Sequence, residues 1–149
     1  MAIAGETCDR ERFASYIWRT VDFQTYKNGY RLDLEATAQL TWTILAEALR
    51  EGPYQTNALI GGIDEDGEAK MYWLDYLGTI QRVTKGGHGY AGYFTASVLD
   101  NAYKGSMTKD EGLEAIRGCI KEMKERFLMD QPHYFVKVIT KDGVEVLEY

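Results

Sequence analysis

The sequence predicts an α+β fold in which helices and antiparallel strands are grouped, and three observations support this class. Segments with helical periodicity come in two consecutive pairs, at residues 7–52 and 90–127. Segments with strand character come in runs joined by short turns, at residues 54–84 and 134–149. The composition is globular, with 45% hydrophobic and 27% charged residues among 149 and only two prolines. We therefore expect residues 1–149 to form one domain without alternating βαβ units.

The first helix is expected at residues 7–29. Thr7 or Asp9 can cap its amino end, and Gly29 can end it. Its apolar face repeats at helical spacing through Phe13, Ile17 and Val21.

The second helix is expected to begin after Asp33, whose carboxylate can cap it, and to stop before Gly52 and Pro53. Its apolar residues form two adjacent stripes, so the helix should be covered on more than one side. The stripes contain Ala38, Trp42, Leu45 and Leu49, and Leu40, Ile44 and Ala48.

Three antiparallel strands are expected next, because the period of the pattern changes after Pro53. Residues 54–63 form an apolar run, the acidic residues 64–68 predict a turn, and residues 69–75 are aromatic and strand-like. Residues 79–84 alternate between two faces after the break at Gly78, which completes a meander.

A third and a fourth helix follow a glycine-rich stretch. The third carries Phe94, Val98 and Ala102 at helical spacing. Thr108 and Glu111 form a capping box that opens the fourth. The apolar stripe of the fourth helix contains Leu113, Ile116, Ile120, Met123 and Phe127.

A hairpin is expected to close the chain. Pro132 marks the exit from the fourth helix, and two strand-like segments flank the turn at Asp142 and Gly143.

Charge and composition narrow the class of protein. The formal net charge is -6, and no cluster of Lys or Arg resembles a phosphate-binding face, so nucleic acid is not expected as a partner. No apolar run reaches the length of a membrane span, and the amino end has no signal-peptide pattern. Cys8 and Cys119 lie far apart and outside any CxxC, which favours reduced thiols and a location in the cytoplasm and nucleus.

Residues 87–92 read Gly87-His88-Gly89-Tyr90-Ala91-Gly92, which matches the dinucleotide pattern GxGxxG. That fingerprint requires a parallel βαβ unit, whereas here a meander precedes the glycines and two helices follow them. We therefore expect a turn, and no cofactor, at this stretch.

Metal binding and nucleophilic catalysis have little support in the spacing. His88 and His133 are the two histidines, and they form no HxxxH or HExxH motif, so His88 is expected to be a structural residue at a strand-to-helix junction. Ser15, Ser97 and Ser106 lack a GxSxG context, and Cys119 is expected in the core. Two groups of carboxylates also have a structural explanation. Glu122 and Glu125 are expected on a solvated helix face, and Asp64, Glu65 and Asp66 in a turn.

Read as a whole, the chain resembles a proteasome β subunit, and most of all the beta type-2 kind, which holds the fourth position of the eukaryotic β ring. The similar segments follow in the order and spacing of that family. They are AGETCDRERFASYI, YKNGYRL, PYQTNALIGGIDEDGEAKMYWLDYLGT, GHGYAGYFTASVLDNAY, MTKDEG and CIKEMKERFLMDQPHYFVKVITKDG.

The resemblance implies the N-terminal-nucleophile hydrolase fold, a four-layer αββα sandwich of two antiparallel sheets between two helical layers. Members of that family place two hairpins before the first helix, whereas Met1-Ala2-Ile3-Ala4 matches only the tail of the last of those strands. The resemblance thus leads us to expect an N-terminally truncated chain.

The resemblance also implies a degenerate catalytic site. Active β subunits attack the peptide with an N-terminal threonine, and they carry Gly-Ser-Gly at the start of the third helix where this chain has Gly87-His88-Gly89. Where they carry Asp-x-x-Ser-Gly-Gly after the fourth helix, this chain has residues 126–131, with Arg126 and Met129 in place of the acid and the hydroxyl. No catalytic residue is therefore expected.

These observations favour a non-catalytic structural β subunit of the 20S core particle, without a cofactor and with other α and β subunits as partners, that serves ATP- and ubiquitin-dependent protein degradation. The alternative is a catalytic threonine-type endopeptidase subunit whose nucleophile-bearing amino end is missing from this sequence. The codons upstream of Met1 distinguish the two. A third hypothesis, small-molecule binding at the glycine-rich turn, requires nucleotides to shift the melting temperature.

Overall fold

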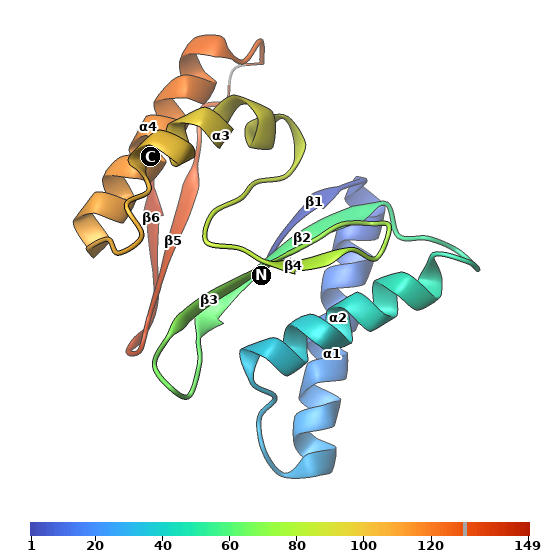
Figure 1. Ribbon diagram of the computed structural model, residues 1–149. Coiled ribbons are helices and arrows are strands. Elements are labelled where there is room, and N and C mark those ends of the chain that lie inside the picture. The colour runs from blue at the N-terminus through green and yellow to red at the C-terminus, as the bar shows by residue number, and fades with distance from the viewer. Residues whose placement is uncertain (130) are drawn as a thin grey trace. The chain divides into compact units, whose positions relative to one another are not determined.

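The computed structural model describes residues 1–129 and 131–149, which form two compact units, residues 1–84 and residues 85–149 (Figure 1). Both units combine helices with antiparallel strands, which confirms the α+β class. The first unit contains β1 (Ala2–Gly5), α1 (Thr7–Asn28), α2 (Leu34–Ala48), β2 (Thr56–Ile63), β3 (Ala69–Leu74) and β4 (Ile80–Arg82). The second contains α3 (Gly89–Ala102), α4 (Lys109–Arg126), β5 (Phe135–Thr140) and β6 (Gly143–Glu148).

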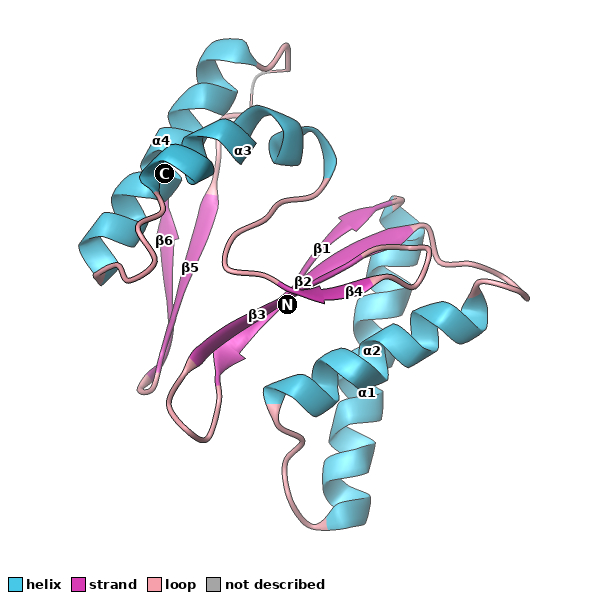
Figure 2. Ribbon diagram, viewed as in Figure 1, coloured by secondary structure: helices cyan, strands magenta, loops and turns pink. Residues whose placement is uncertain are grey.

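The first unit is a four-stranded antiparallel sheet in the order β1-β2-β3-β4, with α1 and α2 packed on one face (Figure 2). Alternate residues of β2 point into the core, as expected for a sheet that is covered on this side. The buried core contains Phe13, Ile17, Ala38, Leu45, Ala58, Ile60, Tyr72 and Leu74.

Strand β1 corrects the element order that hydrophobic periodicity predicts, which has no strand before the first helix. Ala2 pairs with Leu59 and Gly5 with Thr56, and Ile3 packs against the core. Four residues are too few for a periodic signal, so only the resemblance, which assigns Met1-Ala2-Ile3-Ala4 to the end of a strand, predicts it.

The cap of α1 is also different from the prediction. The N-cap is Glu6, whose carboxylate accepts a hydrogen bond from the backbone N–H of Asp9 at 2.9 Å, so the prediction of Thr7 or Asp9 was wrong. The Asp9 carboxylate instead accepts from the backbone N–H of Gln55 at 3.0 Å, while the N–H of Glu6 donates to the carbonyl of Gln55 at 3.0 Å. The N-cap residue Glu6 and Asp9 of α1 thus bond to both backbone groups of Gln55.

We call Gly5, Glu6, Asp9 and Gln55 the α1–β2 clasp. Position 5 of this clasp requires glycine. A Cβ at Gly5 would lie 2.1 Å from the carbonyl oxygen of Gln55, and the φ of Gly5 is 135°. The Gly-Glu-x-x-Asp segment that contributes to the resemblance is therefore a structural device that joins α1 to the start of β2.

Helix α2 begins at its predicted cap, where Asp33 Oδ1 accepts from the N–H of Ala36 at 2.6 Å. Its core face differs from the predicted stripes, because Thr41 is fully buried and Leu49 is exposed. Thr41 tolerates burial because its hydroxyl donates to the carbonyl of Thr37 at 2.8 Å within the helix.

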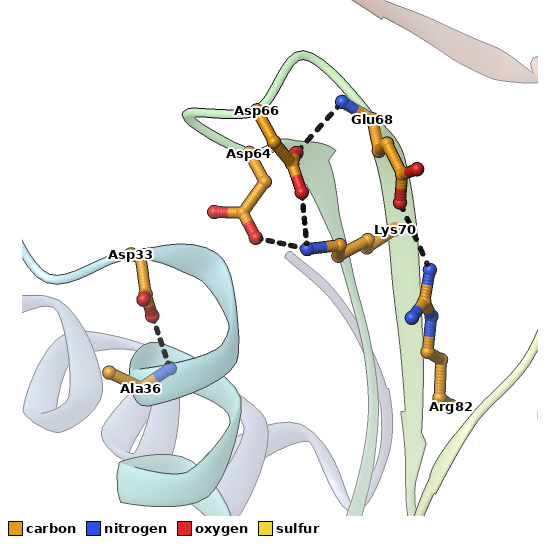
Figure 3. A network of polar contacts seen from close by, with 7 residues as sticks. All are labelled: Asp33, Ala36, Asp64, Asp66, Glu68, Lys70 and Arg82. Atoms are coloured by element: carbon orange, nitrogen blue, oxygen red, sulfur yellow. Dashed lines mark hydrogen bonds and ion pairs between the residues drawn. The ribbon is translucent and has the colours of Figure 1, made fainter.

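The turn between β2 and β3 holds the acidic residues that the sequence places there (Figure 3). Lys70 Nζ donates to Asp64 at 2.6 Å and to Asp66 at 3.1 Å, and the side chains of Lys70 and Asp64 are only 12% and 11% exposed. The hydrogen bond from Lys70 lowers the pKa of Asp64, and the N–H of Glu68 followed by Lys70 lowers the pKa of Asp66. These carboxylates stabilise a hairpin.

The second unit confirms the predicted capping box and the predicted closing hairpin. Thr108 and Glu111 form the capping box of α4, and β5 pairs with β6 from Phe135↔Glu148 to Thr140↔Gly143. The predicted stripe of α4 is shifted, because Cys119 and Met123 are buried while Ile116 is 37% exposed. Within the residues that the structure describes, no helix is both long enough and apolar enough to cross a membrane.

Candidate functional site

The glycine-rich stretch is a close-packed entry into α3. A Cβ at Gly92 would lie 2.9 Å from the carbonyl oxygen of Gly87, and a Cβ at Gly87 would lie 3.0 Å from the Cα of Gly92. Gly89, the first residue of α3, has a φ of 66°, which favours glycine. All three glycines of the GxGxxG pattern therefore have a reason in the local backbone.

The surroundings of this stretch do not form a dinucleotide site. The strand before it, β4, belongs to an antiparallel meander, and α3 leads into α4, so the parallel βαβ unit that the fingerprint needs is not formed here. The neighbouring cation, Lys85, pairs with Asp100 at 3.1 Å and lies 4.9 Å from the ring centroid of Tyr103. The glycines turn the chain, as predicted.

His88 occupies the N-cap position of α3, at the junction where the sequence predicts a structural histidine. Its backbone is extended, with φ −122° and ψ 160°, and its side chain does not cap the helix. The imidazole is half-buried.

The two segments that the resemblance assigns to the catalytic site come together at one end of the α3 and α4 pair. Phe127, the residue after α4, lies 5.3 Å from the ring of Tyr90 and 5.8 Å from the ring of Phe94, measured between centroids. Tyr90 and Phe94 belong to the first two turns of α3. The helix periodicity places these residues on helices but does not show that they meet.

The substituted side chains at the end of α4 do not converge on a reaction centre. Arg126 pairs with Glu122 one turn earlier on the same helix. Met129 is 66% exposed, and Asp130 lies outside the described residues. Arg126 thus presents a guanidinium held in a local ion pair, and Met129 presents an exposed thioether.

Cys119 is a free cysteine on α4 whose side chain is buried. Burial raises the pKa of its thiol, and a side-chain hydrogen bond with Thr95 offsets this effect only in part. Since the thiolate is the nucleophile, a raised pKa disfavours the reactive form of Cys119. Cys119 is a core residue, as predicted.

The remaining titratable residues also fail to form a metal centre within the described parts of the chain, where no three side chains of His, Cys, Asp and Glu are grouped as metal ligands. His133 Nδ1 lies 3.1 Å from Glu148 on the surface. The paired carboxylates at Asp64 and Asp66 are held by Lys70.

Comparison with known proteins assigns the family. The model of the proteasome subunit family matches residues 1–139. The proteasome subunit beta type-2-B of Arabidopsis thaliana is 36% identical over 143 residues, which cover 96% of this chain and 72% of that protein. The proteasome subunit beta type-4 of Saccharomyces cerevisiae is 37% identical over 150 residues, which cover 99% and 76%.

A third relative, the proteasome subunit beta type-2 of Dictyostelium discoideum, is 34% identical over 149 residues, which cover 98% of this chain and 75% of that protein. The relatives carry both type-2 and type-4 names, so the comparison identifies β subunits without selecting one number. With matches that span nearly its whole length, the chain belongs to the proteasome subunit family, among the β subunits.

Proposed function

We propose that the chain is a non-catalytic β subunit of the 20S core particle, which contributes structure and subunit contacts to the stacked rings that degrade proteins in the ATP- and ubiquitin-dependent pathway. The observation that carries the proposal is the pair of segments joined by Phe127. At the positions where active relatives carry a serine and an acid with its hydroxyl partner, this chain has His88, Arg126 and Met129.

The chemistry of these three side chains supports a structural role. An N-terminal threonine needs hydrogen-bonding groups that orient its amine and hydroxyl. Arg126 is held by Glu122, and Met129 is exposed and has no strong hydrogen-bonding group.

The surface of α1 supports the part of the proposal that concerns neighbouring subunits. Large apolar side chains in water are common singly, but a row of them on one element is typical of a contact surface. Aromatic residues suit such contacts because they bury much area with little loss of rotamer freedom. Helical spacing places Tyr16, Phe23 and Tyr26 in such a row on one side of α1. The other exposed aromatic residues of α1 and the turn after it are Trp18 and Tyr30.

The proposal includes three finer assignments: the four-layer αββα sandwich of the N-terminal-nucleophile hydrolase fold, the fourth position of the β ring, and a location in the cytoplasm and nucleus. The family and the grouped helices and strands of both units support the first assignment. The resemblance to beta type-2 subunits supports the second, and the isolated cysteines Cys8 and Cys119 support the third. An electron microscopy map of the assembled particle would test the first two, and a fluorescent fusion in living cells the third.

The central experiment uses the native particle, purified through an affinity tag on this chain and treated with an electrophilic peptide that traps catalytic threonines. We expect proteasome α and β subunits to co-purify and the mass of this chain to remain unchanged while other β subunits gain the adduct. An adduct on this chain would establish the catalytic alternative. Failure to co-purify would refute the assembly role itself.

A further inference from the structure

A surface groove of about 450 Å³ runs beside α4. It belongs to the second unit, and its wall is one side of α4. We call it the cationic groove and define it by its lining residues, Arg117, Ile120, Lys121, Lys124, Glu125 and Tyr149.

Tyrosine rings contact two of the cations of this groove, Arg117 and Lys124, without neutralising them. The N–H and carbonyl groups of Tyr134 and Tyr149 bond to each other at 3.0 and 2.9 Å, which extends the β5–β6 ladder by one residue pair. Arg117 donates to the Tyr149 hydroxyl at 3.2 Å, and its guanidinium lies 5.5 Å from that ring centroid. Lys124 Nζ lies 5.5 Å from the centroid of Tyr134. Cation–π contacts attract the charge yet leave it positive.

The carboxylates beside the groove are weak competitors for these cations. Glu114 lies 3.2 Å from Arg117, and Glu125 lies 3.8 Å from Lys121, with every side chain of both pairs at least 48% exposed. Exposed ion pairs of this kind contribute little free energy, so another carboxylate can replace either partner.

The charge of this segment is opposite to that of the whole chain. Residues 117–126 carry four cationic side chains and two carboxylates, whereas the formal net charge of the chain is -6. Cations near the carboxyl end of a helix stabilise its dipole, which explains their presence but not their ordered contacts with two tyrosines.

We propose that the cationic groove binds an acidic, extended segment of a partner protein. Arg117, Lys121 and Lys124 follow one another along α4 at intervals of about 6 and 4.5 Å. Carboxylates on alternate residues of an extended chain are about 6.8 Å apart, which long Lys and Arg side chains can match. Ile120 and the ring of Tyr149 offer apolar contact beside the charges. A polyanionic nucleic acid fits less well, because the chain as a whole repels it.

The test measures binding of a short fluorescein-labelled peptide with glutamate at alternate positions to the full chain by fluorescence anisotropy. The Lys121→Glu/Lys124→Glu variant reverses two charges in the groove. The Lys104→Glu/Lys141→Glu variant makes the same charge change at exposed positions outside it. We expect the groove variant to lose at least about tenfold in affinity, or about 1.4 kcal/mol, and the control variant to lose clearly less.

Four results would overturn the proposal: no binding, equal loss in both variants, equal binding of the same peptide with glutamine for glutamate, or tighter binding of a single-stranded oligonucleotide. Far-UV circular dichroism of both variants verifies that α4 remains folded. Peptide binding is measured on the chain itself and does not depend on co-purification with other subunits.

Discussion

At the scale of single residues, Asp9 is the side chain whose role is most specific. Its carboxylate connects α1 to the backbone of Gln55, forty-six positions away in sequence. Replacing it with alanine leaves that N–H without its charged acceptor, and we expect a loss of about 1–2 kcal/mol in the free energy of unfolding. Urea unfolding followed by tryptophan fluorescence reports on this unit, because Trp18, Trp42 and Trp73 all lie in residues 1–84.

The matched control is Asp22→Ala, which removes an exposed carboxylate from the same helix. We expect it to change the unfolding free energy by less than about 0.5 kcal/mol. An equal loss of unfolding free energy in the two variants would show that the charge on α1, and not the hydrogen bond to Gln55, stabilises the fold.

Lys70 gives a prediction that depends on pH. Asp64 and Asp66 have a lower pKa in the folded chain than the value of about 3.9 in an unfolded chain. Their ionised forms therefore favour folding at pH above that value, and this contribution is lost as the pH falls through the folded pKa values. Lys70→Met should be less stable than the parent at neutral pH, and the difference should narrow below about pH 4.

Urea midpoints measured from neutral to strongly acidic pH test this prediction. Arg82→Met is the control, since Arg82 pairs with Glu68 at 3.7 Å between well-exposed side chains. A constant difference between parent and Lys70→Met across the acidic range would contradict the contribution of Lys70 to the lowered pKa values of Asp64 and Asp66.

At the scale of elements, two helical glycines have opposite expected effects. Gly92 lies against the backbone of Gly87, where an added Cβ would clash, whereas a Cβ at Gly112 on α4 meets nothing within 4 Å. Alanine favours helix over glycine by about 0.5–1 kcal/mol. We therefore expect Gly112→Ala to stabilise the second unit and Gly92→Ala to destabilise it, measured by hydrogen exchange of α3 and α4. Stabilisation by Gly92→Ala would refute the close approach.

The ends of helices could be predicted where the capping interaction lies between residues that are close in sequence. The capping box at Thr108 and Glu111 and the cap at Asp33 each act within one helical turn, so the sequence alone identifies them. The cap of α1 could not be predicted, because Asp9 is recruited by Gln55 and glutamate is an uncommon cap. Strand β1 exists only through its pairing with β2, which is a contact between distant segments.

The candidate site, too, could be predicted only in part. Its residues, His88, Arg126 and Met129, came from the resemblance, and the helix boundaries beside them came from periodicity. That Phe127 would meet Tyr90 and Phe94 depends on how α3 packs on α4, which spacing along the chain does not determine. The contacts of Arg117 with Tyr149 and of Lys124 with Tyr134 could not be predicted for the same reason. They depend on how the β5–β6 hairpin packs on α4.

At the scale of the whole molecule, the β5–β6 hairpin should determine how the chain behaves by itself. Within the described residues each of its strands pairs only with the other, so each leaves one backbone edge unpaired. One face of the hairpin also exposes four apolar side chains, those of Phe135, Ile139, Val144 and Val146. Lys137 and Glu148 lie on the same face.

Unpaired edges beside an exposed apolar face promote strand addition between molecules, so we expect the purified chain to self-associate as its concentration rises. Val144→Lys/Val146→Lys places two charges on that face, and light scattering should then show a shift toward the monomer. The competing surface is the exposed aromatic row of α1, and Tyr16→Lys/Tyr26→Lys changes it by the same number of charges. If the α1 variant alone restores the monomer, association proceeds through the helix and not through the hairpin. A stable monomer of the parent chain at micromolar concentration would contradict both routes.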